Sequence, residues 1–260
     1  MLAKSFERDV LEVEDRRQWA TARDVQERFM QRPAPPTDLL DYSARCRQLH
    51  DLGGDCFDFL PNGGNKLAFA VGDASGKGLA AALMISNVQS SLRTAALLSA
   101  NDLTATLGAV NRQVHASSLS DRYATLFYAV LDATRETLHY VNAGHNPPLI
   151  LRRDGSVDWL ETGGAPVGMF RDWDFEQGSA SMNPGDVLIA YTDGVVEAIN
   201  PAGEEWGVEG LQKAAVECAA QCADDVVEAI FRAMDEFSQG RQTDDATVLV
   251  LQCSRDFRVN

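Results

Sequence analysis

The sequence has no long hydrophobic run and too few basic residues to balance its acidic ones. No apolar stretch reaches the roughly 18 residues that a membrane-spanning helix needs. The N-terminus, MLAKSFERDVLEVEDRR, is charged throughout and lacks the apolar segment of a signal peptide. The net charge of −15 argues against binding to nucleic acid or to an anionic membrane, because both need a basic surface. These absences predict a soluble, cytoplasmic protein without nucleic-acid or membrane partners.

Cysteine and histidine are also scarce, which argues against a zinc site. The five cysteines are odd in number, and only Cys218 and Cys222 lie close together, without a companion His or Cys pair. We therefore expect buried thiols, Cys56 among them. The 260 residues, of which 45% are hydrophobic, are enough for one large domain or for one domain with an appendage.

The stretch AVGDASGKGLAAA, residues 70–82, raises the question of a phosphate-binding loop. A Walker A loop has four residues between its glycines, and a Ser or Thr follows its Gly-Lys pair. Here only three residues separate Gly72 from Gly76, and Gly78 follows Lys77 where the hydroxyl should stand. A carboxylate, Asp73, also lies where a phosphate would approach. The stretch therefore argues against a nucleotide-binding switch and leaves the role of Asp73 to be explained.

Hydrophobic periodicity divides the chain into a helical extension and one domain. Residues 3–32 contain no Gly or Pro and have apolar residues near helical spacing, which predicts a helix that the prolines of 32–36 end. This helix either lies on the following domain or forms a dimerising, signal-transmitting coiled helix. We expect residues 1–36 to be this helix with its proline-rich linker, and 37–260 to be a single domain.

Within the domain, runs of strands separate two groups of helices. Strands are predicted at 67–71, 125–131, 138–141, 149–151, 187–191 and 247–251, and helices near 79–98, 102–117, 208–220 and 223–238. Paired helices between groups of strands favour antiparallel sheets layered with helix pairs over alternating βαβ units. The expected class is α+β.

Carboxylates stand at several predicted strand ends beside glycine or another turn residue. Asp55 follows Gly-Gly, Asp73 ends the strand 67–71, Asp193 lies in YTDGVVEA, and Asp244 and Asp245 precede the last strand. Carboxylates that converge on one rim of a sheet repel one another, and a divalent cation removes that repulsion. Oxygen ligands suit Mg²⁺ or Mn²⁺, which keep water molecules that can become nucleophiles.

Six stretches give the sequence a specific family resemblance. They are GGDCFDF, GDASGKG, NAGHNPPL, GAPVG, GDVLIAYTDGVVEA and TDDATVLVL. Their order resembles that of the metal-dependent (type 2C-like, PPM-type) serine/threonine phosphatases, and most of all the bacterial branch typified by SpoIIE and RsbU. The resemblance covers nearly all of residues 39–253. The upstream ARDVQERFMQRPAPP is similar to the helix that precedes this domain in many members.

The resemblance implies an α-β-β-α sandwich, in which two antiparallel sheets lie between helix pairs and metals bind at one edge. It also implies two Mn²⁺ or Mg²⁺ ions whose bridging water attacks a phosphoserine or phosphothreonine, with Asp73 bridging the ions. Asp244 is favoured over Asp245, because only one of two adjacent strand side chains faces the rim. The implied ligands are Asp55, Asp73, the backbone carbonyl of Ala74, Asp193, Asp244 and Asp245.

Other motif residues are expected to have lesser roles. Lys77 is either a solvated first-turn residue or a substrate contact, and Ser75 is placed to cap the following helix. His145 is expected to belong to a rigid turn more than to act as a general acid. Cys56 and Val196 stand where relatives often have an aromatic residue and a threonine, which leaves every implied ligand in place.

The leading functional hypothesis is a protein serine/threonine phosphatase in bacterial signalling. Resemblance to the branch implies that the substrate is a phosphorylated STAS-domain anti-sigma-factor antagonist in a partner-switching stress response. It also leaves room for an upstream activator protein, and for a homodimer through the N-terminal helix that controls activity. The alternative is a catalytically silent docking module with the same fold. Such a module would be expected to have lost ligands, and all of them are present here.

Overall fold

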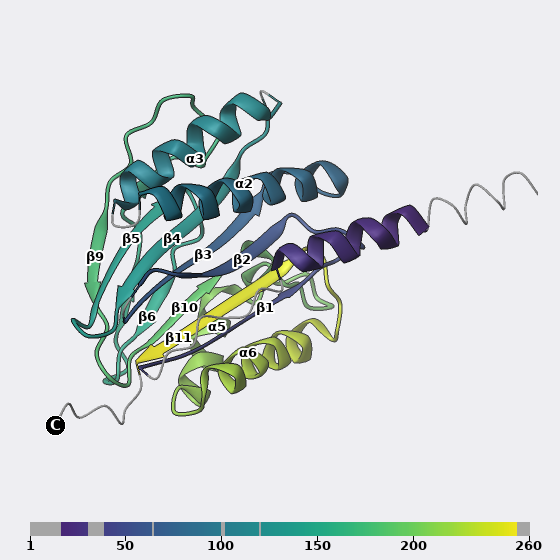
Figure 1. The fold of residues 1–260 in the computed structure, drawn as a ribbon. Helices are drawn as coiled ribbons and strands as arrows, with labels where there is room; N and C mark the ends of the chain where they lie inside the picture. Colours follow the sequence, from purple (N-terminus) through teal and green to yellow (C-terminus); the bar gives the residue numbers. More distant parts are fainter. Residues whose placement is uncertain (1–16, 31–38, 64, 100–101, 120, 254–260) are drawn as a thin grey trace, which may run out of the picture.

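The computed structural model describes residues 17–30, 39–63, 65–99, 102–119 and 121–253. Within them, two β-sheets pack face to face (Figure 1). Sheet A has the strand order β1 (Leu40–Arg47), β11 (Ala246–Cys253), β10 (Val187–Tyr191), β6 (Leu149–Leu151) and β7 (Val157–Trp159). Sheet B has the order β2 (Asp55–Pro61), β3 (Lys66–Ala74), β4 (Ala124–Asp132), β5 (Thr137–Ala143) and β8 (Gly163–Gly164), and β9 (Gly178–Ser181) also pairs with β5. Among the strands of the described residues, only the short β5–β8 pairing is parallel.

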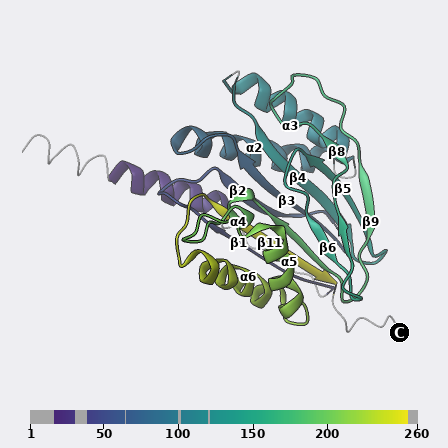
Figure 2. The same cartoon turned by 180° about the vertical axis from the view of Figure 1, so that it is seen from behind.

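A pair of helices covers the outer face of each sheet (Figures 1 and 2). Helices α2 (Leu79–Leu98) and α3 (Leu103–Ser117) lie over sheet B, and α5 (Gly207–Cys218) and α6 (Ala223–Ser238) lie over sheet A. A one-turn helix, α4 (Asp193–Val196), follows β10. The expected α-β-β-α sandwich is thereby confirmed. No helix in the described ranges is long and apolar enough to cross a membrane.

Buried apolar side chains hold the layers together. Between the sheets lie Phe69, Phe127, Leu188 and Leu249, each fully buried. The central strands β3 and β4 are buried on both faces and therefore read as nearly continuous apolar runs. Helix α6 is amphipathic instead, so its 3.6-residue periodicity was legible in the sequence and its predicted bounds agree with the observed ones.

The turn that leads into α2 differs from expectation. The N-cap of α2 is Gly78, without a side-chain cap, so the prediction that Ser75 caps this helix is wrong. The Ser75 hydroxyl instead accepts a hydrogen bond from the backbone N–H of Tyr123, at 3.1 Å. The chain needs three more residues before the helix can begin, because it turns through Gly76 and Gly78, both with positive φ.

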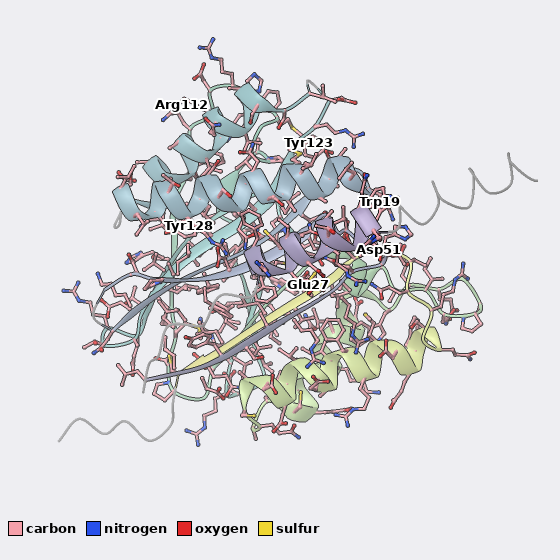
Figure 3. The ribbon with its side chains drawn as sticks, turned by 45° about the vertical axis from the view of Figure 1, so that its right-hand side comes forward. Trp19, Glu27, Asp51, Arg112, Tyr123 and Tyr128 are labelled. Carbon is pink, nitrogen blue, oxygen red and sulfur yellow. The ribbon has the colours of Figure 1, made fainter. Side chains whose placement is uncertain are left out.

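The described part of the N-terminal extension, residues 17–30, is a helix that lies beside α2 (Figure 3). The buried side chain of Gln26 donates to the Gly53 carbonyl at 2.7 Å and accepts from the Gly53 N–H at 3.1 Å. At the end of the helix, the Phe29 carbonyl accepts a hydrogen bond from Arg93 of α2. The interpretation that this helix lies on the domain therefore holds for residues 17–30. Residues 3–16 and the proline-rich stretch fall outside the described residues.

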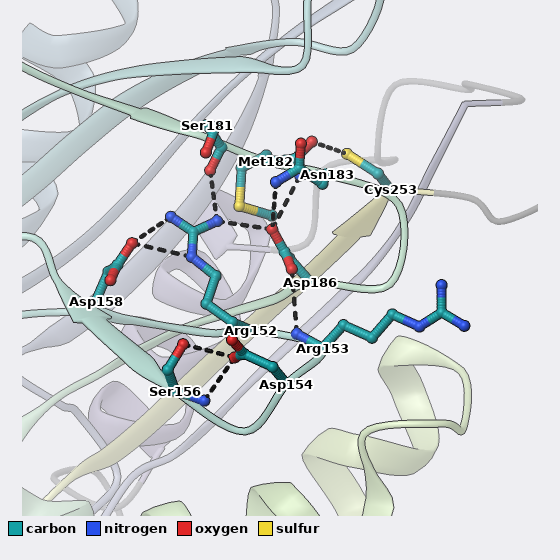
Figure 4. A network of polar contacts seen from close by, with 10 residues as sticks. All are labelled: Arg152, Arg153, Asp154, Ser156, Asp158, Ser181, Met182, Asn183, Asp186 and Cys253. Atoms are coloured by element: carbon teal, nitrogen blue, oxygen red, sulfur yellow. Dashed lines mark hydrogen bonds and ion pairs between the residues drawn. The ribbon is translucent and has the colours of Figure 1, made fainter.

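A polar network braces the end of sheet A at which β10 begins (Figure 4). The Arg152 guanidinium donates to Asp186 at 2.7 Å, to the Ser181 carbonyl at 2.8 Å and to Asp158 at 2.9 Å. Asp186 precedes β10 and is almost fully buried. The network thus ties the β6–β7 turn to the connection between β9 and β10 at one end of β10.

Candidate metal centre

Two of the predicted ligands lie side by side in sheet B. Asp55 is the first residue of β2, and the antiparallel register places it directly opposite Asp73 of β3. Side chains of directly opposed residues share one face of the sheet, so the two carboxylates are neighbours. Asp55 is only 2% exposed, whereas Asp73 is partly exposed. Asp73 is the second-last residue of β3, which ends at Ala74, close to where the sequence placed the strand end.

The other two come from sheet A. Asp193 follows β10 and Asp244 precedes β11, and these antiparallel neighbours bring the end of one strand to the start of the other. Two threonines join this pair of ends to sheet B. The hydroxyls of Thr192 and Thr247 donate to one oxygen of Asp55, at 2.7 and 2.8 Å. Carboxylates from both sheets therefore gather at one edge of the sandwich.

The negative charge of the carboxylates at this edge exceeds the positive charge around them. Burial raises the pKa of Asp73 to about 9, and repulsion from Asp55, Asp193 and Asp244 adds to the shift. Burial also raises the pKa of Asp55 to about 7, although the two threonine hydrogen bonds oppose this. The pKa of Asp193 is raised by burial and then by the charge of Asp244. A bound cation would reverse these shifts, since it favours the charged form of each carboxylate.

The adjacent residues Asp244 and Asp245 have different surroundings. Both oxygens of Asp245 accept backbone N–H groups, from Leu49 and Gly54, each at 2.7 Å. Asp245 thereby holds the loop that leads into Asp55. One oxygen of Asp244 accepts the Asp245 N–H at 2.9 Å, and the other lies 2.6 Å from the ammonium of Lys77.

Two glycines allow the backbone to approach this edge closely. A Cβ on Gly194 would lie 1.9 Å from the Asp245 carbonyl oxygen, so no larger residue can follow Asp193 in this geometry. A Cβ on Gly54 would lie 3.3 Å from the carbonyl oxygen of Ala74. The N–H of Ala74 donates to the Gly54 carbonyl at 3.0 Å, which keeps the loop after Asp73 against the start of β2.

The oxygen donors are of the type that a hard divalent cation prefers, although the side chains are not arranged around an ion. In the part of the chain that the structure describes, no three His, Cys, Asp or Glu side chains are arranged to hold an ion as they stand. Asp55 gives one oxygen to protein donors, and Asp244 gives both of its oxygens. The Asp73 carboxylate accepts no hydrogen bond from any described residue. An all-oxygen set with excess charge and one open carboxylate matches Mg²⁺ or Mn²⁺.

His145 lies behind the edge in a tight turn. Its Nδ1 is 2.8 Å from the Thr125 hydroxyl, and its backbone N–H donates to Asn142 at 2.7 Å. Burial lowers its pKa to about 4. Its Nε2 is buried without a partner among the described residues. These surroundings favour the expected turn role over that of a general acid.

Sequence reasoning missed three polar residues at this edge, Thr192, Thr247 and Gln26. The two threonines stand one and two residues from predicted ligands, in YTDG and DDAT, which is the one signal that could have pointed to them. Gln26 carried no local signal, because its partner Gly53 is 27 residues away in sequence.

Comparisons with known sequences assign the chain to a family. Residues 63–254 match the family described as Stage II sporulation protein E (SpoIIE). Protein IcfG of Synechocystis is 30% identical over 217 residues, which cover 74% of this chain and 34% of IcfG. The phosphoserine phosphatase RsbU of Bacillus subtilis is 25% identical over 232 residues, which cover 89% of this chain and 68% of RsbU. The chain thus spans about a third of IcfG and about two thirds of RsbU.

Solved structures show the same architecture. The RsbU and RsbW domains of a Mycobacterium tuberculosis protein align with a TM-score of 0.71 and 27% identity, over 85% of this chain and 62% of that one. The SiaA PP2C domain of Pseudomonas aeruginosa aligns with a TM-score of 0.78 over 93% of this chain and 98% of that domain. At 20% identity, the second likeness concerns the fold alone.

Proposed function

The chain belongs to the stage II sporulation protein E (SpoIIE) family and is a PP2C-type phosphatase domain of its RsbU branch, and from this we propose that it is an active, metal-dependent protein serine/threonine phosphatase. The observation that carries the proposal is the convergence of Asp55, Asp73, Asp193 and Asp244 at one edge. Burial and repulsion between the carboxylates raise the pKa values of the first three. A docking module that binds no metal would gain nothing from the energetic cost of gathering these carboxylates.

In the proposed site, Asp55, Asp73, Asp193 and Asp244 would hold the metals, with Asp73 contributing to both and the Ala74 carbonyl as a further oxygen. When bound, two Mn²⁺ or Mg²⁺ ions would supply a water of lowered pKa and neutralise charge on the phosphoryl oxygens.

Residues around the ligands position them. Thr192 and Thr247 fix the orientation of Asp55 through one of its oxygens and leave its other oxygen for an ion. Asp245 is assigned a positioning role, because backbone N–H groups occupy both of its oxygens. The carboxylates would hold the metals, and the attacking group would be a water, so the reaction would need no nucleophilic side chain from this chain.

The substrate proposed is a phosphorylated STAS-domain anti-sigma-factor antagonist in the cytoplasm, within a partner-switching pathway with an upstream activator. Support comes from the 25% identity to RsbU, a phosphoserine phosphatase, and from the likeness to a structure that holds RsbU and RsbW domains together. An in-vitro screen of phosphorylated STAS-domain proteins tests this choice, and dephosphorylation of unrelated phosphoproteins at equal rates would contradict it.

Residues 1–36 are proposed as a regulatory extension that forms a homodimer. The helix 17–30 and α2 line a groove of about 740 Å³, to which Val25, Leu79 and Leu83 contribute apolar surface. Gln26 connects this helix to Gly53, two residues before Asp55. Sedimentation and rate measurements on a chain that begins at Thr37 test the proposal, and an unchanged mass and rate would contradict it.

The catalytic proposal is tested by hydrolysis of para-nitrophenyl phosphate with Mn²⁺, with Mg²⁺ and with EDTA. Activity is expected only with metal, and Asp193→Asn is expected to remove it because the variant loses a ligand charge. Asp172→Asn, in an exposed loop, is the matched control and should retain the wild-type rate. A folded wild type that neither hydrolyses the substrate nor binds Mn²⁺ would favour the docking module instead.

A further inference from the structure

Lys77 makes the one direct cation contact with a proposed ligand among the described residues. Its Nζ lies 2.6 Å from Oδ2 of Asp244 and 3.3 Å from the carbonyl oxygen of Thr243. Lys77 precedes α2 and belongs to the sheet B side, whereas Asp244 precedes β11 of sheet A. The contact therefore spans the edge at which the four carboxylates gather.

The backbone around Lys77 directs this reach. Gly76 and Gly78 flank it with φ values of 92° and 73°, a region that residues with a Cβ adopt at a cost. A Cβ on Gly76 would also lie 1.8 Å from Nη1 of Arg122, which donates to the Ser75 carbonyl at 2.9 Å. The loop is thus held in place on one side of Lys77, and the Gly-Lys-Gly sequence has a structural use that nucleotide binding does not explain.

Both oxygens of Asp244 are engaged by this arrangement. Oδ1 accepts the Asp245 N–H, and Oδ2 is on the Lys77 ammonium. In the described part of the chain, this ammonium is the one cation paired with the carboxylates of the edge.

We propose that Lys77 competes with the metal for Asp244, so that an ion can take Oδ2 only after the ammonium leaves it. The inference rests on the proposed function and adds a determinant of metal affinity to it. The Lys77 side chain is 57% exposed and that of Asp244 35%, so the pair is weak enough for a divalent ion to displace it. The ammonium released in this way remains beside the site.

Calorimetric titration of the full chain with Mn²⁺ tests the competition without relying on catalysis. Lys77→Met keeps the length of the side chain and removes its charge, and should bind Mn²⁺ about fivefold more tightly than wild type. Lys77→Arg keeps a cation within reach and should stay near the wild-type affinity. Because Lys77 is largely exposed, the thermal midpoint of each metal-free variant should confirm a folded chain.

A matched control separates the contact from a general charge effect. Arg241 lies on the same loop as Asp244, is exposed, and has no side-chain hydrogen bond or ion pair with any described residue. Arg241→Met makes the same charge change and should alter the affinity less than about twofold. Unchanged or weaker Mn²⁺ binding by Lys77→Met would overturn the inference, as would an equal gain from Arg241→Met. Absence of Mn²⁺ binding by wild type would instead overturn the proposed function itself, and the inference with it.

Discussion

At the scale of single residues, the carboxylate edge depends on buried hydroxyls as much as on the carboxylates. Asp55 is buried, and two threonine hydroxyls from sheet A are its only described hydrogen-bond donors. A buried charge that loses such a donor is destabilised, because no water replaces it. Thr247 is itself fully buried, so its hydroxyl cannot form a hydrogen bond with solvent instead.

Thr247→Val, which has nearly the same shape, should lower the free energy of unfolding by about 1.5–3 kcal/mol, the usual value for a hydrogen bond to a charged group. Urea denaturation measures this loss. Thr247→Ser retains the hydroxyl and should lose clearly less. A valine variant as stable as wild type would show that Asp55 is protonated, or that it is solvated in a way its burial does not suggest.

His145 provides a second prediction at this scale, through pH. Its folded pKa of about 4 lies below its ordinary value of 6.5, so between these values the unfolded chain binds the proton and the folded protein does not. Its contribution to stability is complete above pH 6.5 and is lost as the pH falls towards 4, by about 3 kcal/mol in total.

The measurement is urea denaturation between pH 7 and pH 4.5 for wild type and His145→Gln. The carboxylates titrate in both proteins, so the difference between the two curves isolates the imidazole. That difference should narrow as the pH falls. Parallel curves would contradict a buried, neutral imidazole.

At the scale of elements, hydrogen bonds connect the helix 17–30 to the turn before β2. Gln26 accepts hydrogen bonds from the Gly53 N–H and from Gln48, and donates to the Gly53 carbonyl. A buried backbone group that loses its partner costs about 1–3 kcal/mol. The geometry of the Gly53–Asp55 turn thus depends on a residue outside the sandwich.

Gln26→Ala should therefore increase hydrogen exchange at the Gly53 amide, because that N–H loses its acceptor. Exchange measured by mass spectrometry on peptides that cover 49–56 detects the change. Gln18→Ala, on an exposed position of the same helix, is the control and should leave exchange there unchanged. Equal protection in both variants would show that the helix does not hold this turn.

At the scale of the whole molecule, the two ends of β10 have separate tasks. Asp193 follows the strand at the carboxylate edge, and Asp186 precedes it in the Arg152 network (Figure 4). Asp186 has a side chain only 4% exposed, so without Arg152 it would be a buried, unpaired charge. Stability and metal chemistry should therefore be separable by mutation.

Arg152→Met should lower stability by about 3–5 kcal/mol, because it breaks a buried ion pair from one side. The folded fraction should keep its metal-dependent rate, since the network is at the far end of the strand. Arg153→Met is the control, because the Arg153 side chain points away from the network (Figure 4). Thermal unfolding and phosphatase assays below the transition measure both quantities, and a lost rate in folded Arg152→Met would contradict the separation.

Much of the sandwich could be predicted from the sequence, because its long elements have a clear hydrophobic pattern. The predicted helices 79–98 and 223–238 have the bounds of α2 and α6, and the central strands are long apolar runs. Strand β1 was missed because its half-buried residues include Arg45 and Arg47, and β2 because Asp58 interrupts its apolar run. Strands β7, β8 and β9 were missed because they have two to four residues and, unlike the short β6, no apolar run. Their pairing comes from neighbours distant in the chain, which a local pattern does not record.

The sequence by itself determined the residue types of the site and their positions at strand ends. Glycine and aspartate after an apolar run mark the end of a strand, and this signal depends only on neighbouring residues. Only the tertiary structure decided which partner each carboxylate has. Asp244 pairs with Lys77, and Asp245 accepts two backbone N–H groups. Asp55 accepts the hydroxyls of two threonines from the side of the other sheet. Adjacent aspartates are alike in sequence. They differ in space because strand register and sheet packing bring each a different donor, from as far as 196 residues away.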